Sequence, residues 1–66
     1  MNVPKLRGLM TEKQINVETL AELVSIDRSS MYRKLNNADK ITIGEAMRIK
    51  QALKMSDELA IEIFLR

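Results

Sequence analysis

Residues 19–35, with the sequence TLAELVSIDRSSMYRKL, decide the fold that we expect for this chain. The first half of this stretch carries apolar residues at helical spacing, which predicts a short helix with one inward side. The expected inward residues are Leu20, Ala21, Leu23 and Val24. A break is predicted at Ser25 and Ile26, and Asp27 after it suits the position just before a helix. The stretch therefore predicts two short helices joined by a tight turn.

The second of these predicted helices has an apolar side and a polar side. Met31 and Leu35 are separated by one helical turn, so both are expected to anchor the helix to a core. The same period turns five side chains outward: Arg28, Ser29, Tyr32, Arg33 and Asn36. Guanidinium, hydroxyl and amide groups on a short helix can contact base edges and phosphates in a DNA major groove. The alternative is an ordinary solvated face, and for Tyr32 a half-buried packing role has equal weight.

Cap signals before this stretch predict one further helix. Pro4 suits the first turn of an opening helix, because its missing backbone N–H is not needed there. This helix is expected to end near residues 12–14. Asn16 is then a favourable cap for the helix that begins the quoted stretch. Lys5, Arg7 and Lys13 are basic residues of this part of the chain, for which solubility is the simpler explanation than phosphate contact.

Two more helices are predicted after a loop at residues 37–41. Thr42 and Glu45 have the three-residue spacing of a capping box, which predicts the start of a fourth helix. Its expected inward residues are Ala46, Met47, Ile49 and Leu53. Ser56 suits the cap of a fifth helix, and acidic residues follow it in the first turn. No stretch alternates long enough to predict a strand, so the expected fold class is all-α with five helices.

Length and composition limit the possible functions. A chain of 66 residues allows one domain with one small core, so we expect residues 1–66 to form a single domain with its function on the surface. The chain has no cysteine and no histidine, which removes thiolate metal sites and the commonest general base. Catalysis, a cofactor, a metal and a small-molecule substrate are therefore not expected. No apolar run approaches the length of a membrane-spanning helix, and no signal-peptide pattern is present.

The C-terminal segment is apolar on nearly all sides. Residues 59–65 contain a single charged residue, Glu62, so one face can pack on the domain while the rest stays exposed. Exposed apolar patches usually mark association surfaces. We therefore expect a homodimer whose interface includes Ile61, Phe64 and Leu65. The alternative is that this end simply folds back on the domain.

The order of motifs resembles a known family. The pattern Leu-Ala-(three residues)-Ser-Ile-(two residues)-Ser-Ser-Met in residues 20–31 is similar to the helix-turn-helix of the phage Cro/repressor superfamily. The run at 32–36, the block at 45–53 and the ending at 63–65 resemble small Cro-like proteins of prophages in Gram-positive bacteria. The resemblance implies a compact, five-helix domain of the lambda-repressor-like type. It also implies a sequence-specific transcriptional regulator that occupies double-stranded DNA operators in the bacterial cytoplasm or nucleoid.

The resemblance implies roles for individual residues. By position, Arg28, Ser29, Tyr32 and Arg33 are expected to contact bases. Asn16, Asn36 and Lys40 are expected to contact phosphates. Because no effector domain follows residue 66 in this sequence, repression by occupying the operator is the expected mode of action.

Four positions depart from the family pattern. Ser25 stands where glycine is usual in the turn, and Val17 stands where a polar side chain usually meets a phosphate. Met10 and Leu35 stand where the superfamily often has an Arg–Glu ion pair. An ion pair replaced on both sides by apolar residues can be neutral or stabilising, so this double change is compatible with the fold.

Two other classes of function are alternatives to a DNA-binding regulator. A helix-turn-helix scaffold can serve as a protein-interaction module, such as an antirepressor or an antitoxin-like factor, with the apolar end as its binding surface. A catalytic domain is the least favoured class, because the chain lacks the common nucleophile–base arrangements and phosphate-binding loops.

Overall fold

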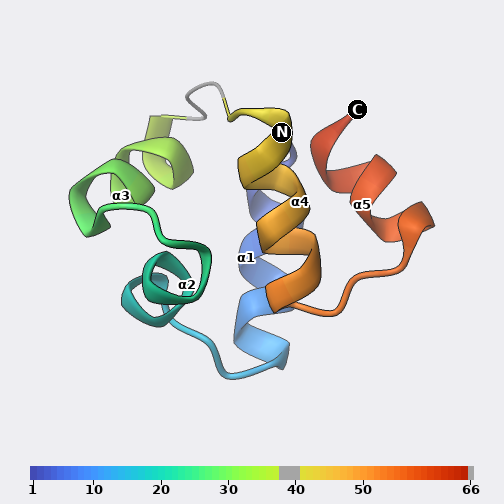
Figure 1. Ribbon diagram of the computed structural model, residues 1–66. Coiled ribbons are helices and arrows are strands. Elements are labelled where there is room, and N and C mark those ends of the chain that lie inside the picture. Colours follow the sequence, from blue (N-terminus) through green and yellow to red (C-terminus); the bar gives the residue numbers. More distant parts are fainter. Residues whose placement is uncertain (38–40, 66) are drawn as a thin grey trace.

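The computed structural model describes residues 1–37 and 41–65, and all regular secondary structure within them is helical. The helices are α1 (Val3–Glu12), α2 (Val17–Val24), α3 (Arg28–Asn37), α4 (Ile43–Ala52) and α5 (Asp57–Phe64). The predicted all-α class with five helices is therefore confirmed. Figure 1 shows α4 at the centre, with α1 behind it, α2 and α3 on one side and α5 on the other.

The helices α2, α3 and α5 begin directly after the cap residues that the sequence predicted. The Asn16 side chain accepts a hydrogen bond from the Thr19 backbone N–H at 2.8 Å, and Asp27 Oδ2 accepts from Ser29 N–H at 3.0 Å. Ser56 Oγ accepts from the Leu59 backbone N–H at 3.1 Å. Each of these bonds satisfies a backbone N–H that the first helical turn leaves without an intrahelical acceptor. Local sequence therefore fixes where these three helices begin.

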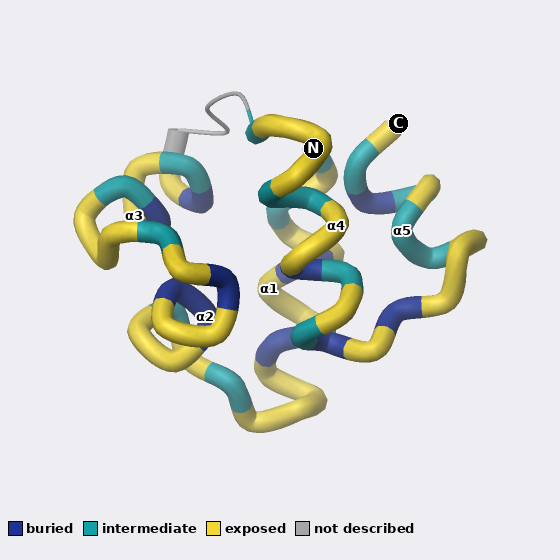
Figure 2. Tube along the Cα trace, in the orientation of Figure 1, coloured by how far each residue is buried: buried dark blue, intermediate teal, exposed yellow. Residues whose placement is uncertain are grey.

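A single core lies between the helices (Figure 2). Its buried apolar residues are Leu6, Met10, Leu20, Ala21, Val24, Met31, Leu35, Ile49, Leu53, Met55 and Ile63. The expectations for Leu23 and Met47 are wrong, because each side chain is 56% exposed. On α2 the buried residues occupy positions i, i+1 and i+4, and Leu23 lies outside that narrow side. On α4 the buried residue is Ile49, and Met47 lies about 200° around the helix from it.

The turn between α2 and α3 is tight and left-handed. Ser25 has φ 57° and ψ 42°, and the Ile26 N–H donates to the Ala21 carbonyl at 2.9 Å. A residue with a side chain pays about 1–2 kcal/mol for this conformation, which explains why glycine is usual there. Gln14 and Lys54 adopt the same region after α1 and α4, with φ 58° and 52°. Within residues 1–37 and 41–65, three helices thus end with non-glycine residues in the left-handed region.

The N-terminal helix is held on two sides. The Asn2 backbone N–H donates to the Ile63 carbonyl at 2.6 Å, and Lys5 forms an ion pair with Glu62 of α5. Met10 of α1 and Leu35 of α3 are both buried in the same apolar core. The position of α1 is therefore fixed by its contacts with α5 and by the core.

A capping box begins α4, and an ion pair links it to α3. Thr42 Oγ1 accepts from the Glu45 N–H at 3.0 Å, and Glu45 Oε1 accepts from the Thr42 N–H at 3.0 Å. The Lys34 ammonium of α3 lies 3.3 Å from the same Glu45 oxygen, and both side chains are largely buried. The pKa of Glu45 is lowered from its usual value of 4.5, chiefly by the Thr42 backbone hydrogen bond and, against the opposing effect of burial, also by Lys34.

This lowered pKa predicts a pH dependence of stability. A carboxylate whose pKa is depressed by folding stabilises the native state above its unfolded pKa, and this contribution is lost as the pH falls through the native pKa. We expect Glu45→Gln to lower the free energy of unfolding at neutral pH and to match the wild type in acid, as measured by urea unfolding over a pH series. Glu12→Gln, on an exposed position of α1, is the control. A deficit of Glu45→Gln that persisted unchanged in acid would contradict the role of the charge.

Candidate nucleic-acid interface

The outer face of α3 carries the polar residues that the helical period predicted. The exposed residues of this face are Arg28, Ser29, Tyr32, Arg33 and Asn36. On the opposite side Met31 and Leu35 are buried, so the helix cannot rotate without exposing its anchors. The exposure of the face is confirmed, and its contact with DNA stays a prediction at this point.

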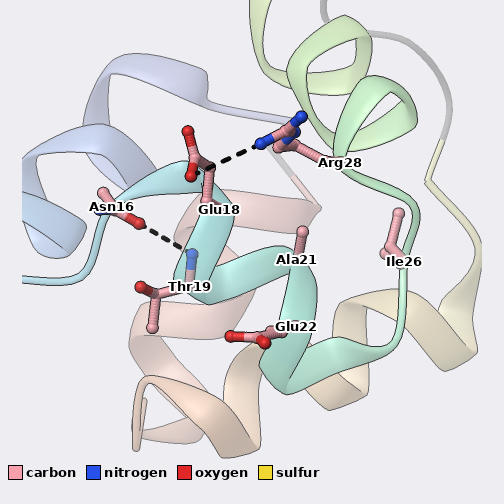
Figure 3. Close-up of a pocket in the computed structure, with 7 residues that line it drawn as sticks. All are labelled: Asn16, Glu18, Thr19, Ala21, Glu22, Ile26 and Arg28. Carbon is pink, nitrogen blue, oxygen red and sulfur yellow. Dashed lines mark hydrogen bonds and ion pairs between the residues drawn. The ribbon is translucent and has the colours of Figure 1, made fainter.

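Arg28 has a partner that the sequence did not reveal. Its Nη1 lies 3.7 Å from Oε2 of Glu18, in the first turn of α2, and the two side chains are 67% and 57% exposed. Figure 3 shows the two side chains facing each other across the space between α2 and α3. Helical periodicity could not predict this pair, because it joins two helices whose relative placement depends on the turn at Ser25.

The Arg33 side chain is oriented by a hydrogen bond within α3. Its Nη2 donates to Ser30 Oγ at 3.2 Å, and the Ser30 N–H lies 3.4 Å from Asp27 Oδ2. Ser30 is half-buried and therefore has a structural role, whereas Ser29 is exposed on the outer face. The guanidinium of Arg33 is held along the helix surface and keeps further N–H donors for a ligand.

The two asparagines predicted to contact phosphates use their carbonyl oxygens within the protein. Asn16 Oδ1 caps α2, and Asn36 Oδ1 accepts a hydrogen bond from Arg7 Nη2 of α1 at 2.7 Å. In both residues the NH₂ group is the remaining polar group, and an NH₂ group can donate to a phosphate oxygen. Arg7 thus stands beside Asn36 at the edge of the α3 face. Lys40, the third predicted phosphate contact, lies outside the described residues.

A polar hollow of about 430 Å³ separates the start of α2 from the start of α3 (Figure 3). Its lining consists of Asn16, Glu18, Thr19, Ala21, Glu22, Ile26 and Arg28. Val17, which stands where a polar residue was expected, is half-buried and packs against the core. The donors at this edge are therefore the Asn16 amide, the Thr19 hydroxyl, the Arg28 guanidinium and the backbone at the start of α2.

A second hollow, of about 450 Å³, is apolar and lies between α4 and α5. It is lined by Ile43, Ala46, Met47, Lys50, Asp57, Ala60, Ile61, Phe64 and Leu65. All three residues predicted for a dimer interface line it, and Leu65 is 77% exposed. The sequence did not predict the α4 side of this groove, where Ile43 is 81% exposed. Lys50 Nζ and Asp57 Oδ1, 3.0 Å apart, form an ion pair between the two helices.

Other kinds of site find little support. In residues 1–37 and 41–65, no group of three or more histidine, cysteine or acidic side chains is arranged to hold a metal ion. Within the same ranges, the helices fall short of the length and apolarity that crossing a membrane requires.

Comparison with protein families gives one match. The model of the Cro/C1-type HTH DNA-binding domain matches residues 5–58, from the first turns of α1 to the start of α5. Comparison with curated proteins and with solved structures gives no match. The matched range includes α2, the turn at Ser25 and α3, which form the helix-turn-helix. The chain belongs to the Cro/C1-type helix-turn-helix DNA-binding domain family.

Proposed function

We propose that this protein is a sequence-specific transcriptional regulator of the Cro/repressor type, encoded by a phage or prophage. It occupies a double-stranded DNA operator by placing α3 in the major groove. The observation that carries this proposal is the outer face of α3, where Arg28 and Arg33 are exposed while Met31 and Leu35 fix the back of the helix. Membership of a DNA-binding family supports the same conclusion. The proposed place of action is the bacterial cytoplasm or nucleoid.

The proposed contacts divide between bases and phosphates. The base contacts come from Arg28, Ser29, Tyr32 and Arg33. Forked guanidinium groups can donate two parallel hydrogen bonds to O6 and N7 of guanine, which makes the two arginines the principal candidates for specificity. The phosphate contacts come from the NH₂ groups of Asn16 and Asn36 and, by resemblance alone, from Lys40. Residues 1–66 act as one domain, and no catalytic step or cofactor is required.

The regulator is proposed to act as a homodimer. A single helix-turn-helix contacts one half-site, and two half-sites spaced by about 34 Å lie on the same side of the duplex. The apolar groove between α4 and α5 supports this proposal, because it leaves Ile61, Phe64 and Leu65 available to a second copy of the chain. A symmetric interface on this groove would present two copies of α3 to one duplex.

Selection of bound sequences from a random duplex pool tests the function as a whole. An inverted repeat with half-sites one helical turn apart is the expected result. If each subunit neutralises about three phosphates, the affinity of a dimer should fall with salt with a log–log slope near −5. Recovery of no enriched sequence, together with a slope near zero, would overturn the proposal.

The second candidate function is a protein-interaction module of the antirepressor or antitoxin type. The apolar groove between α4 and α5 favours it, because a groove of this kind can also accept an apolar helix of a different protein. A gel-shift experiment at physiological salt separates the two candidates. The module would leave a duplex carrying the inverted repeat unshifted, whereas the regulator shifts it.

Replacing Ile61 with aspartate tests the proposed dimer. The substitution places a charge in the apolar groove, and burying an unpaired carboxylate between two subunits is strongly unfavourable. We expect sedimentation to show a shift from dimer to monomer and the affinity for the inverted repeat to fall by at least about tenfold, which corresponds to about 1.4 kcal/mol.

Leu23→Asp is the matched control for this test, because Leu23 is an exposed apolar residue of α2 outside the groove. It should leave sedimentation unchanged. A wild-type protein that sediments as a monomer both free and on the palindromic duplex would rule out the dimer.

A further inference from the structure

The carboxylate of Glu18 occupies an unexpected place for a DNA-binding surface. It lies in the first turn of α2, lines the polar hollow and stands 3.7 Å from Arg28, the first residue of α3. A negative charge at the edge of a DNA-contacting face repels phosphates and reduces affinity. An ion pair as exposed as this one contributes little to stability. General affinity therefore does not explain this carboxylate, and folding explains it only through the small favourable interaction of a carboxylate with the first turn of a helix.

The geometry of the pair leaves part of Arg28 available. Glu18 Oε2 lies beside Nη1, at one end of the guanidinium group. The opposite edge, formed by Nε and Nη2, carries two parallel N–H donors. Such an edge matches the O6 and N7 acceptors that guanine presents in the major groove. Glu18 can therefore pair with Nη1 while Nε and Nη2 of the same guanidinium group donate to a base.

We propose that Glu18 determines specificity by positioning Arg28 for a guanine in the major groove and by keeping it from a phosphate. The inference rests on the proposed function, because it takes α3 to be the helix that enters the groove. The side chain of Arg28 is long and flexible, and without Glu18 it could turn from the guanine to a nearby phosphate. The Glu18 carboxylate satisfies part of that charge within the protein. The neutralised pair gains less from the DNA backbone than a lone arginine would, so the guanine contact carries a larger share of the binding energy.

The proposed positioning role of Glu18 predicts that removing its charge raises the affinity for non-specific DNA and lowers the discrimination between operator sequences. Glu18→Gln keeps the size of the side chain but removes its charge, so Arg28 becomes free to pair with a phosphate. Affinity for a duplex without the operator should rise, and the salt slope should steepen. Discrimination at the base pair that Arg28 contacts should fall by about tenfold, the scale of one bidentate contact.

The experiment uses the full chain and the duplex enriched from the random pool. Affinities of wild type, Glu18→Gln, Arg28→Ala and the double variant are measured on that duplex and on versions with one base pair changed. The position at which Arg28→Ala loses discrimination identifies its base pair. Glu18→Gln should lose discrimination at this position alone, and should change nothing further there in the Arg28→Ala background. Thermal unfolding of Glu18→Gln should show at most the small loss expected when a carboxylate is removed from the first turn of a helix.

Glu22→Gln is the matched control, because Glu22 is exposed on the same helix and lines the same hollow. Equal effects of Glu18→Gln and Glu22→Gln would show a general charge effect and overturn the inference. Unchanged discrimination by Glu18→Gln on a duplex that the wild type binds specifically would also overturn it, while leaving the proposed function standing. Failure of the wild type to bind any duplex would instead remove the proposed function and the inference together.

Discussion

A Leu35→Glu variant is expected to lose a large part of its free energy of unfolding at room temperature. Leu35 is 2% exposed in the core, and a carboxylate placed there has no charged partner, since the buried residues that the structure describes are all apolar. An uncompensated buried charge costs about 3–5 kcal/mol. A domain of this length has a total stability of about 3–10 kcal/mol, so the substitution removes a large part of it. Far-UV circular dichroism with urea unfolding measures the loss.

Leu35→Met is the control, since it conserves volume and polarity and should cost less than about 1.5 kcal/mol. The paired variant Met10→Arg with Leu35→Glu tests the interpretation of the site. It introduces an Arg–Glu ion pair at the two positions, so it should be more stable than the sum of the two single changes, although less stable than the wild type. Strict additivity would show that the two positions do not face each other, and a Leu35→Glu variant as stable as Leu35→Met would contradict the cost of a charge at this position.

Local signals made much of this fold predictable from the sequence. Asn16, Asp27 and Ser56 each cap a helix as expected, because a cap depends on residues within three positions along the chain. The two sides of α3 were equally predictable, because Met31 and Leu35 are separated by a single helical turn. These features need no knowledge of how the helices pack.

Features that depend on packing between helices were not predictable. Leu23 and Met47 are apolar residues on helices with a narrow buried side, and apolar character alone could not show that neighbouring helices leave them exposed. The same limit applies to the pairs Glu18–Arg28 and Arg7–Asn36, whose members are brought together by the turn and by the core. Sequence therefore located the face of α3 but not the partners that α1 and α2 supply to its side chains.

Replacing Arg33 with alanine is expected to weaken operator binding by about 1–3 kcal/mol and to relax the preference at one base pair. Arg33 is exposed, and its hydrogen bond to Ser30 Oγ holds the guanidinium on the outer face of α3. Its remaining donors can then form a bidentate contact with guanine. Fluorescence anisotropy on the selected duplex and on versions with one base pair changed gives the affinity and the preference in one series.

Arg48→Ala removes the same charge from an exposed position on α4 and is the matched control. It should change affinity little and should leave every base preference intact. The salt dependence then separates the two possible roles of Arg33. A base contact leaves the slope nearly unchanged while one preference is lost, whereas a phosphate contact lowers the slope by about 0.9 and weakens all duplexes equally. Uniform weakening with a smaller slope would therefore assign Arg33 to the backbone, and the specificity of α3 would then depend on Arg28 and its partner Glu18.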